Sequence, residues 1–295
     1  MIKIGQSMHP EWVGGDLGRL DEELRQVKDA GADCCELVLH GLDVVIGNSV
    51  IPSRQDAVIE VLRKHELDYT MHMPHGLNLL DAEMLETWLG IFRAGIKFAQ
   101  TAGIKLINYH AGIAKSDDKS LIKKEMEQIK TLATSAPNIV FCMENLFFYG
   151  KEDISPARSA GEMIAFYEQI NLDNFKLTFD IGHSFLRHKG NKGAMLKDMD
   201  ALLPYIGHVH LHDNFGTMME PKGPGPGPGF GGHRIICGIG DIHLPLGWGS
   251  IPIDDALAKL ENYNGIVNLE IEHRFNYNYK ESLSLVREKL KTVNG

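Results

Sequence analysis

Histidine and acidic side chains recur at the ends of short apolar segments along this sequence. The chain has 295 residues, of which 14 are histidine. Imidazole nitrogen together with carboxylate oxygen suits Zn, Mn, Fe or Co, whereas an all-oxygen set favours Mg or Ca. We therefore expect a site for two or three divalent metal ions, zinc first, with manganese, iron or cobalt as alternatives. The candidate ligands are His72, His110, Glu144, Asp180, His183, His210, Asp241, His243 and Glu270.

Each of these residues also has an ordinary structural interpretation. A single inward histidine is more often a hydrogen-bonded core residue than a ligand. Asp180, which opens the motif DIGH, sits where a helix-capping carboxylate is common. The metal hypothesis depends on the whole set lying at corresponding ends of successive units. Glu144 is our candidate for a carboxylate that bridges two ions.

The segment HVHLHD contains three histidines of one parity, and they cannot all be ligands. We expect His210 to be the ligand, His208 to lie deeper with a structural role, and His212 to lie near the rim. His75 and Glu272 are expected near the site without being ligands, because each has a better-placed neighbour two or three residues away.

Short β-branched or apolar runs alternate with longer amphipathic stretches from residue 2 to residue 291, which is typical of repeated βα units around a parallel sheet. Helices are expected at 16–30, 53–64, 82–102 and 116–135, the last with Ser116 as its N-cap. We predict one α/β domain over residues 1–295, a single (β/α)8 TIM barrel. The eight expected strands are 2–6, 34–39, 68–73, 105–110, 138–144, 175–180, 206–212 and 265–272.

Alternate residues of a barrel strand point into the lumen or outward against the helices. In strand 175–180 this parity places Phe175, Leu177 and Phe179 outward and Asp180 inward. The same parity points Glu144 inward, and it gives the histidines and Glu270 at the other strand ends a polar, inward position. Barrel enzymes carry their chemistry at these carboxyl ends.

A Gly/Pro-rich insertion at residues 216–238 interrupts the alternation and is too irregular for a helix. It follows His210 and returns just before Asp241, so we expect either a lid over the site or a mobile excursion. As a lid it would bring Lys222, His233 and Arg234 to an anionic group of a substrate.

Composition narrows the class of protein. Apolar residues make up 43% and charged residues 23%, as in an ordinary globular domain. No apolar run approaches the ~20 residues of a membrane span, and the first residues lack a secretory signal, so we expect a cytoplasmic protein without a membrane partner. The four cysteines form no CxxC pair and are expected to be reduced. The net charge of −9 disfavours nucleic acid and favours a small-molecule substrate.

An ordered set of motifs resembles the xylose isomerase-like barrel superfamily, which includes endonuclease IV. The motifs are HMPHGLNLLD (72–81), NYHAG (108–112), MEN (143–145), DIGH (180–183), HLHD (210–213), DIHLPLGWGSI (241–251) and LEIE (269–272). In the endonuclease IV branch the resemblance implies three zinc ions. The first would be held by His72, His110 and Glu144, the second by Glu144, Asp180, His210 and Glu270, and the third by His183, Asp241 and His243.

The isomerase and epimerase branches imply a different use of the same positions. There Glu144, Asp180, His210 and Glu270 resemble a single-metal site whose two glutamates act as acid and base, with His183 orienting the substrate. The segment 40–52 does not resemble the DNA-binding loop of endonuclease IV, and the 216–238 insertion is foreign to it. We therefore favour an isomerase or epimerase of a sugar or sugar phosphate. A phosphoesterase acting on abasic-site DNA or a small phosphodiester, and an inactive barrel that binds a ligand, are the alternatives.

Overall fold

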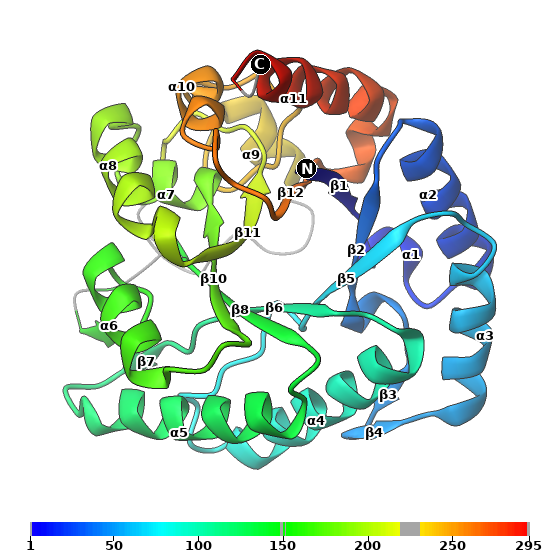
Figure 1. Cartoon of the computed structure of the whole chain (residues 1–295), viewed down its shortest axis with the longest axis vertical. Coiled ribbons are helices and arrows are strands. Elements are labelled where there is room, and N and C mark those ends of the chain that lie inside the picture. The colour runs from blue at the N-terminus through cyan, green and yellow to red at the C-terminus, as the bar shows by residue number, and fades with distance from the viewer. Residues whose placement is uncertain (1, 148–149, 151, 219–230, 294–295) are drawn as a thin grey trace.

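Eight parallel strands close into a barrel in this computed structural model, which describes residues 2–147, 150, 152–218 and 231–293. Figure 1 shows the ring of strands surrounded by helices. Around the barrel the order is β1, β12, β11, β10, β8, β6, β5 and β2. The barrel strands are β1 (Lys3–Ser7), β2 (Cys34–Val38), β5 (Asp68–His72), β6 (Leu106–His110), β8 (Val140–Glu144), β10 (Phe175–Asp180), β11 (Ile206–Leu211) and β12 (Ile266–Leu269).

Helices follow the strands and cover the outside of the barrel (Figure 1). They are α1 (Pro10–Val13), α2 (Leu17–Asp29), α3 (Pro52–Leu62), α4 (Leu85–Ala102), α5 (Ser120–Ser135), α6 (Ala160–Ile170), α7 (Ile181–Arg187), α8 (Lys192–Leu202), α9 (Gly231–Cys237), α10 (Ile253–Ala258) and α11 (Tyr279–Val293). Short 3₁₀ turns span Leu39–Gly41, Leu203–Tyr205 and His273–Asn278. Two small ribbons join β3 (Val45–Ile46) to β4 (Ser49–Val50) and β7 (Ala114–Lys115) to β9 (Asp153–Ile154).

The predicted TIM barrel is confirmed, and all eight predicted strands are present. Two predicted helix starts are wrong. The helix predicted from residue 82 begins at Leu85, and α5 begins at Ser120, so Ser116 is not its N-cap. The Ser116 hydroxyl instead accepts the amide hydrogen of Asp118 at 3.0 Å, which closes a local turn before the helix. This competing hydrogen bond is a common alternative to capping for serine.

The insertion at 216–238 also departs from expectation in its described part. Residues 219–230, including Lys222, lie outside the described residues. Gly231–Cys237 forms the helix α9, so this end of the insertion is helical although the Gly/Pro content predicted no helix. Arg234 on α9 is exposed.

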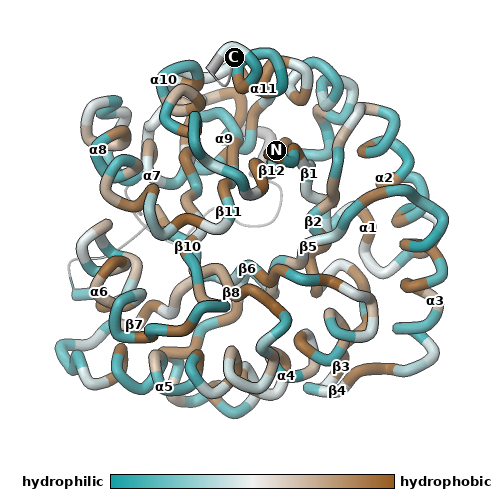
Figure 2. The backbone as a smooth tube through the Cα atoms, in the orientation of Figure 1, coloured by the Kyte–Doolittle hydropathy of each residue, from teal (hydrophilic) through white to brown (hydrophobic). Residues whose placement is uncertain are grey.

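Side-chain parity in the strands agrees with the prediction. Phe175, Leu177 and Phe179 are buried in the layer between strands and helices. On α4, Phe92 packs edge-on against Tyr109 of β6, with ring centroids 5.5 Å apart. Figure 2 shows the corresponding pattern, in which hydrophobic positions gather where helices face the barrel. Truncating a side chain as buried as Phe92 costs about 3–5 kcal/mol of stability in comparable cores.

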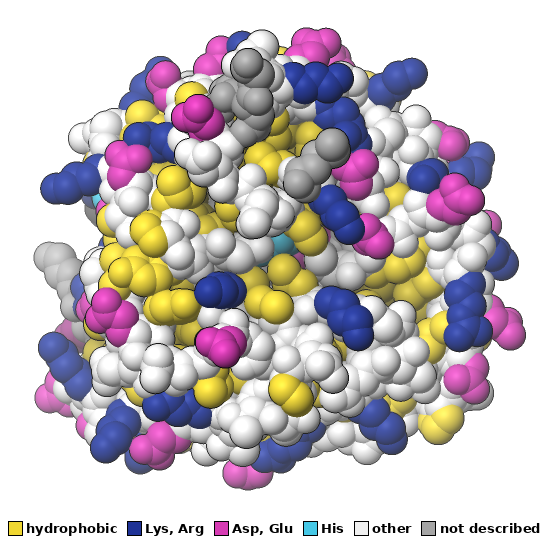
Figure 3. Space-filling model, in the orientation of Figure 1, with side chains coloured by type: hydrophobic (Ala, Val, Ile, Leu, Met, Phe, Trp, Pro, Cys, Tyr) yellow, Lys and Arg dark blue, Asp and Glu magenta, His cyan; other side chains and the backbone are white. Residues whose placement is uncertain are grey.

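Charged residues of both signs are interspersed over the face seen in Figure 3, around a depression at the centre of the barrel. Neither sign forms a continuous stripe on that face. None of the helices in the described ranges has the length and apolar content required to cross a membrane.

Candidate metal centre

The nine predicted ligands converge at the carboxyl ends of the barrel strands, and Glu144 is at the centre of them. The Glu144 carboxylate at the end of β8 is buried. Its Oε2 lies 3.2 Å from His72 Nε2 and 3.4 Å from His210 Nδ1. Its Oε1 lies 3.1 Å from His183 Nδ1. Histidines therefore lie against both oxygens of this carboxylate, and the role of Glu144 as a bridging ligand stays a prediction.

Four of the candidate histidines are oriented in the same way, because the Nδ1 atom of each donates to a backbone carbonyl. The acceptors are the carbonyls of Met73, His75, Asn145 and Glu270, for His72, His110, His183 and His243 respectively, at 2.5 to 3.1 Å. A carbonyl accepts and cannot donate, so each Nδ1 carries the hydrogen. The Nε2 atoms are then left to face the site, as in metal-binding histidines whose other nitrogen is fixed by an acceptor.

Asp180 combines the two roles that the sequence left open. Its Oδ1 accepts the amide hydrogen of His183 at 2.5 Å and so caps α7. Its Oδ2 is buried without a hydrogen bond and lies 3.9 Å from His210 Nδ1. The backbone on both sides is held by Asn145, whose side chain bonds the Asp180 amide and carbonyl at 2.8 and 2.9 Å. The cap therefore orients the second oxygen toward the site.

The last strand contributes Glu270 and turns Glu272 away. Glu270 Oε2 lies 3.4 Å from His210 Nδ1, inside the cluster. Glu272 Oε1 lies 3.0 Å from His9 Nε2 at the side of the cavity, and its side chain is 36% exposed. The backbone of Glu272 donates to the His243 carbonyl at 3.0 Å, which fixes the chain after the strand.

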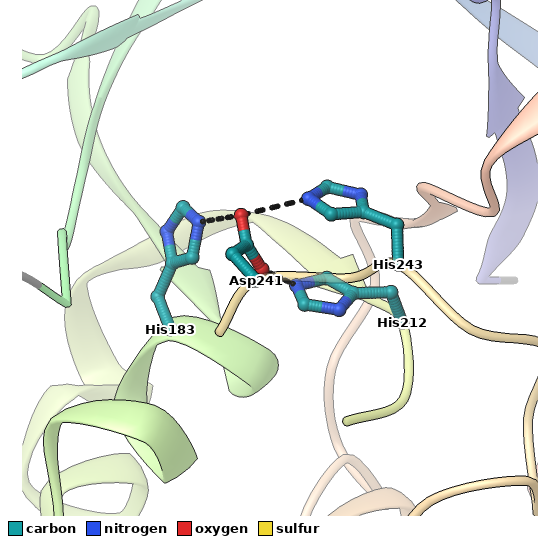
Figure 4. A group of neighbouring side chains, drawn as sticks. All are labelled: His183, His212, Asp241 and His243. Atoms are coloured by element: carbon teal, nitrogen blue, oxygen red, sulfur yellow. Dashed lines mark hydrogen bonds and ion pairs between the residues drawn. The ribbon is translucent and has the colours of Figure 1, made fainter. Parts of the chain in front are cut away.

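A second cluster contains His183, Asp241 and His243 and also includes His212. Figure 4 shows Asp241 between the three imidazole rings. Its Oδ2 lies 2.9 Å from His243 Nε2 and 3.3 Å from His183 Nε2, and its Oδ1 lies 3.3 Å from His212 Nε2. The expectation that His212 lies near the rim is wrong, since its side chain is fully buried. It follows the last residue of β11, where the alternation of the strand no longer decides its direction.

Asp213 attaches the loop that carries Asp241 and His243 to the end of β11. Its carboxylate accepts amide hydrogens from Gly247, Gly249 and Ile251 at 2.9 to 3.2 Å. A Cβ on Gly249 would lie 2.3 Å from Asp213 Oδ1, so this approach requires glycine. The motifs HLHD and DIHLPLGWGSI are thus two halves of one structural unit.

Sequence reasoning missed Glu36, which lies on β2 with 0% exposure. Its two oxygens lie 2.9 Å from His208 Nε2 and 2.9 Å from His210 Nε2. This confirms a deeper position for His208 and leaves Nδ1 of His210 facing Glu144 and Glu270. The inward parity of CCELV was the available signal, because Glu36 shares a strand face with Cys34 and Val38.

The electrostatics of the cluster favour bound cations. Burial acts to lower the pKa of His183, but Asp180 and Asp241 outweigh it and the pKa lies well above its ordinary value. Burial also acts to lower the pKa of His243, but Asp241 outweighs it and raises this pKa to about 10. By contrast burial lowers the pKa of His110 to about 4. Where carboxylates hold protons on buried imidazoles, a metal ion can take the place of those protons.

The residues present fit divalent ions, because buried donor atoms of the cluster are left without hydrogen bonds. Several buried polar atoms of the cluster contact one another at 3.1 to 3.9 Å but form no hydrogen bond within the described structure, among them Glu144 Oε1, Asp180 Oδ2, His210 Nδ1 and Asp241 Oδ1. Unpaired polar groups of this kind are costly in a protein interior. Groups of ligand atoms within 4.8 Å of one another include His72, His110 and Glu144, then Glu144, Asp180 and His210, and the cluster around Asp241.

A cavity of about 520 Å³ opens onto these ligands. Carboxylates and histidines of both clusters line its base, and Leu146, Ile271, Val38 and Met8 supply apolar walls. A volume of this size is typical of small-molecule sites.

Relatives of the chain differ in what their names describe. An uncharacterized protein of Methanocaldococcus jannaschii, MJ1614, is 26% identical over 226 residues, or 74% of this chain and 76% of its own length. A probable endonuclease 4 of Aquifex aeolicus is 28% identical over 118 residues, or 38% of this chain and 42% of its own.

Solved structures share the whole fold at low identity. A D-tagatose 3-epimerase-like protein has a TM-score of 0.73 and 20% identity, with 99% of this chain and 98% of its own covered. A xylose isomerase-like protein from Mycobacterium smegmatis in complex with magnesium has a TM-score of 0.72 and 16% identity, with 100% and 98% covered. A D-psicose 3-epimerase from Clostridium cellulolyticum with D-tagatose has a TM-score of 0.69 and 16% identity, with 98% and 99% covered.

The profile of one protein family matches residues 24–289, most of the barrel. It spans all the motif-bearing strand ends described above. The chain therefore belongs to the xylose isomerase-like TIM barrel family.

Proposed function

We propose that this protein is a divalent-metal-dependent isomerase or epimerase of a sugar, in which one carboxylate takes a proton from the substrate and another returns one. One observation carries the proposal. Glu144 Oε2 and Glu270 Oε2 each lie 3.4 Å from His210 Nδ1, so two glutamates from different strands converge on one ligand position at the base of the cavity. Solved neighbours of the same fold include sugar epimerases.

Glu144, Asp180, His210 and Glu270 would hold the catalytic ion, and Glu36 would fix His210 from behind. When bound, a divalent ion supplies Lewis-acid stabilisation of negative charge on vicinal oxygens of a sugar. The two glutamates do the proton chemistry. One removes the proton from the carbon beside the carbonyl group, and the other returns a proton to the opposite face of that carbon, which inverts its configuration.

The cavity favours a substrate without phosphate. Among the described residues that line it, none is lysine or arginine. Phosphate sites are commonly built with such cations, so a neutral sugar suits this lining better than a sugar phosphate. The apolar walls around Leu146 and Ile271 would cover the carbon skeleton of the sugar.

Hydrolysis of a phosphoester is the second candidate function, and a specific observation favours it. Besides the four residues around His210, the structure brings together two further groups of potential ligands, one of which contains His72 and His110 and the other Asp241. Clustered ions generate hydroxide near neutral pH and stabilise the attacking and leaving oxygens of a phosphoester. A sugar epimerase does not need so many ligands for its proton transfers.

The test is a deuterium-exchange assay on protein loaded with Zn, Mn or Co. A panel of ketohexoses that includes D-tagatose, and the corresponding sugar phosphates, is incubated in D2O and followed by NMR. We expect deuterium at the carbon beside the carbonyl and the epimeric product, with both lost in Glu144→Gln and Glu270→Gln. Cleavage of an abasic-site duplex by the same protein, with no exchange into any sugar, would support the phosphoesterase instead.

A further inference from the structure

His212 is the one member of the Asp241 cluster that the family resemblance does not assign to a metal. The four side chains come from three places in the chain: His183 from α7, His212 from the end of β11, and Asp241 with His243 from the following loop. Figure 4 shows that His183 lies on one side of Asp241, while His212 and His243 are stacked on the other. The stacked rings have centroids 4.0 Å apart and planes within 5°.

The separations among these atoms suit one small ion. The Nε2 atoms of the three histidines lie 2.9 to 3.3 Å from the nearest oxygen of Asp241. Ligand atoms placed tetrahedrally around zinc at about 2.0–2.2 Å are separated by roughly 3.4 Å. All four ligand atoms fall within 4.8 Å of one another. Small movements of these four side chains would therefore place their ligand atoms tetrahedrally around one ion.

Hydrogen bonds within the described residues do not account for the buried position of His212. Its side chain is 0% exposed, and its Nε2 lies 3.3 Å from Asp241 Oδ1 and 3.5 Å from Asp180 Oδ1. Within the described residues neither contact has hydrogen-bond geometry, and Nδ1 has no hydrogen-bond partner. Leaving an imidazole unpaired in the interior is unfavourable. Two other features hold it there. A Cβ on Gly182 would lie 2.2 Å from the His212 ring, and the ring of His243, whose backbone has a left-handed φ of 44°, stacks on the His212 ring.

The other two histidines are already prepared as ligands. His183 Nδ1 and His243 Nδ1 donate to the carbonyls of Asn145 and Glu270. The Nε2 atom of each ring therefore faces Asp241 (Figure 4). Two nitrogen acceptors facing a carboxylate acceptor require a proton or a cation between them. Imidazole nitrogen and carboxylate oxygen are both ligands that zinc accepts.

We propose that His183, His212, Asp241 and His243 form a closed, four-coordinate zinc site that His212 completes. This inference rests on the metal centre of the proposed function and extends it. Four protein ligands leave no open position, as in structural zinc sites, whereas catalytic zinc keeps one position for water or substrate. The ion at this site holds the 241–251 loop against β11 and α7. Chemistry is then confined to the neighbouring ion at Glu144, which agrees with proton transfer better than with a multi-ion attack on a phosphoester.

Zinc retention and the cobalt spectrum test the site without an activity assay. The full chain is loaded with zinc and titrated with a chromogenic chelator, for wild type, His212→Ala and the control His188→Ala. His188 is a histidine beyond the end of α7 that pairs with Asp198 outside the cluster. We expect His212→Ala to release one zinc per chain with an affinity lowered by more than the ~10–100-fold that loss of an outer hydrogen-bond partner costs. The control should match wild type.

Cobalt reports the coordination number of the same site. Tetrahedral Co²⁺ absorbs visible light far more strongly than octahedral Co²⁺, and we expect the strong absorption in wild type and its loss in His212→Ala. Gly182→Ala retains every ligand and displaces only the His212 ring, so it should weaken zinc retention even if His212→Ala fails to fold.

Equal zinc retention in wild type and His212→Ala, or a six-coordinate cobalt spectrum in wild type, would overturn the proposal. A protein that shows the tetrahedral cobalt spectrum but exchanges no sugar proton would contradict the proposed reaction. The four-coordinate site would still be supported.

Discussion

Glu36 Oε1 lies 2.9 Å from His210 Nε2, whereas Glu144 and Glu270 lie beside Nδ1 of the same ring. Burial raises the pKa of Glu36, but His210 and His208 outweigh it and hold the pKa well below its usual range, so the carboxylate is an ionised acceptor. Nε2 of His210 therefore carries a hydrogen, and its Nδ1 is the atom that faces Glu144 and Glu270. A carboxylate behind a histidine ligand fixes the tautomer and raises the basicity of the ligand.

Replacing Glu36 by glutamine tests this relationship. Glu36→Gln should lower the affinity for the ion at Glu144 by about 10–100-fold, because the neutral amide no longer fixes His210 as the carboxylate does. Chelator competition on the purified protein measures the change. Asp68→Asn, at an exposed carboxylate paired with Lys3, is the control and should leave metal affinity as in wild type. Unaltered affinity in Glu36→Gln would mean that Glu36 acts only in packing.

Glu144 should be the ligand whose loss has the widest effect. It lies beside histidines of both neighbouring groups, so Glu144→Ala is expected to remove more metal per chain than His110→Ala while circular dichroism still reports a folded barrel. Elemental analysis of protein purified without chelators measures the content. Glu272→Ala is the matched control, since its carboxylate pairs with His9 instead. Full metal content in Glu144→Ala would contradict the ligand assignment.

Metal affinity should increase with pH. Nearby carboxylates raise the pKa of His183, His210 and His243 against the effect of burial, and that of His243 reaches about 10. These imidazoles are protonated at neutral pH without metal, and each must release its proton to bind an ion. Isothermal titrations of zinc in buffers between about pH 6 and pH 9 should give rising affinity and proton release. Affinity independent of pH, with no protons released, would contradict this picture.

Asp213 should stabilise the loop that carries Asp241 and His243. In Asp213→Asn the amide group faces backbone N–H donors that now have no acceptor, so we expect a loss of about 3 kcal/mol in the free energy of unfolding. Denaturant titration of the metal-free protein measures it, and zinc retention should fall at the same time. Asp200→Asn, which breaks an exposed pair with Lys259, should cost at most about 1 kcal/mol. Equal stabilities of the two variants would show that the loop is held by other contacts.

The sequence by itself determined the barrel and the edge at which the candidate ligands meet. Alternation with a period of two identifies a strand and the direction of its side chains from local residues alone, as in Phe175–Asp180. In parallel strands the carboxyl ends share one edge of the sheet, so residues such as Glu144 and Asp180 were expected together. Their roles as ligands stay predictions.

Only the tertiary structure decided which partners these residues meet. Glu36 and His210 are 174 residues apart in the sequence, and no local pattern pairs them. His212 lies beyond the last residue of β11, where the chain leaves the sheet and parity ceases to specify direction, so its burial against Asp241 depends on Gly182 and the returning loop. Ser116 failed as a cap because a turn hydrogen bond to Asp118 competed for its hydroxyl. Periodicity reports which way a side chain leaves a regular element, whereas long-range packing sets what it contacts.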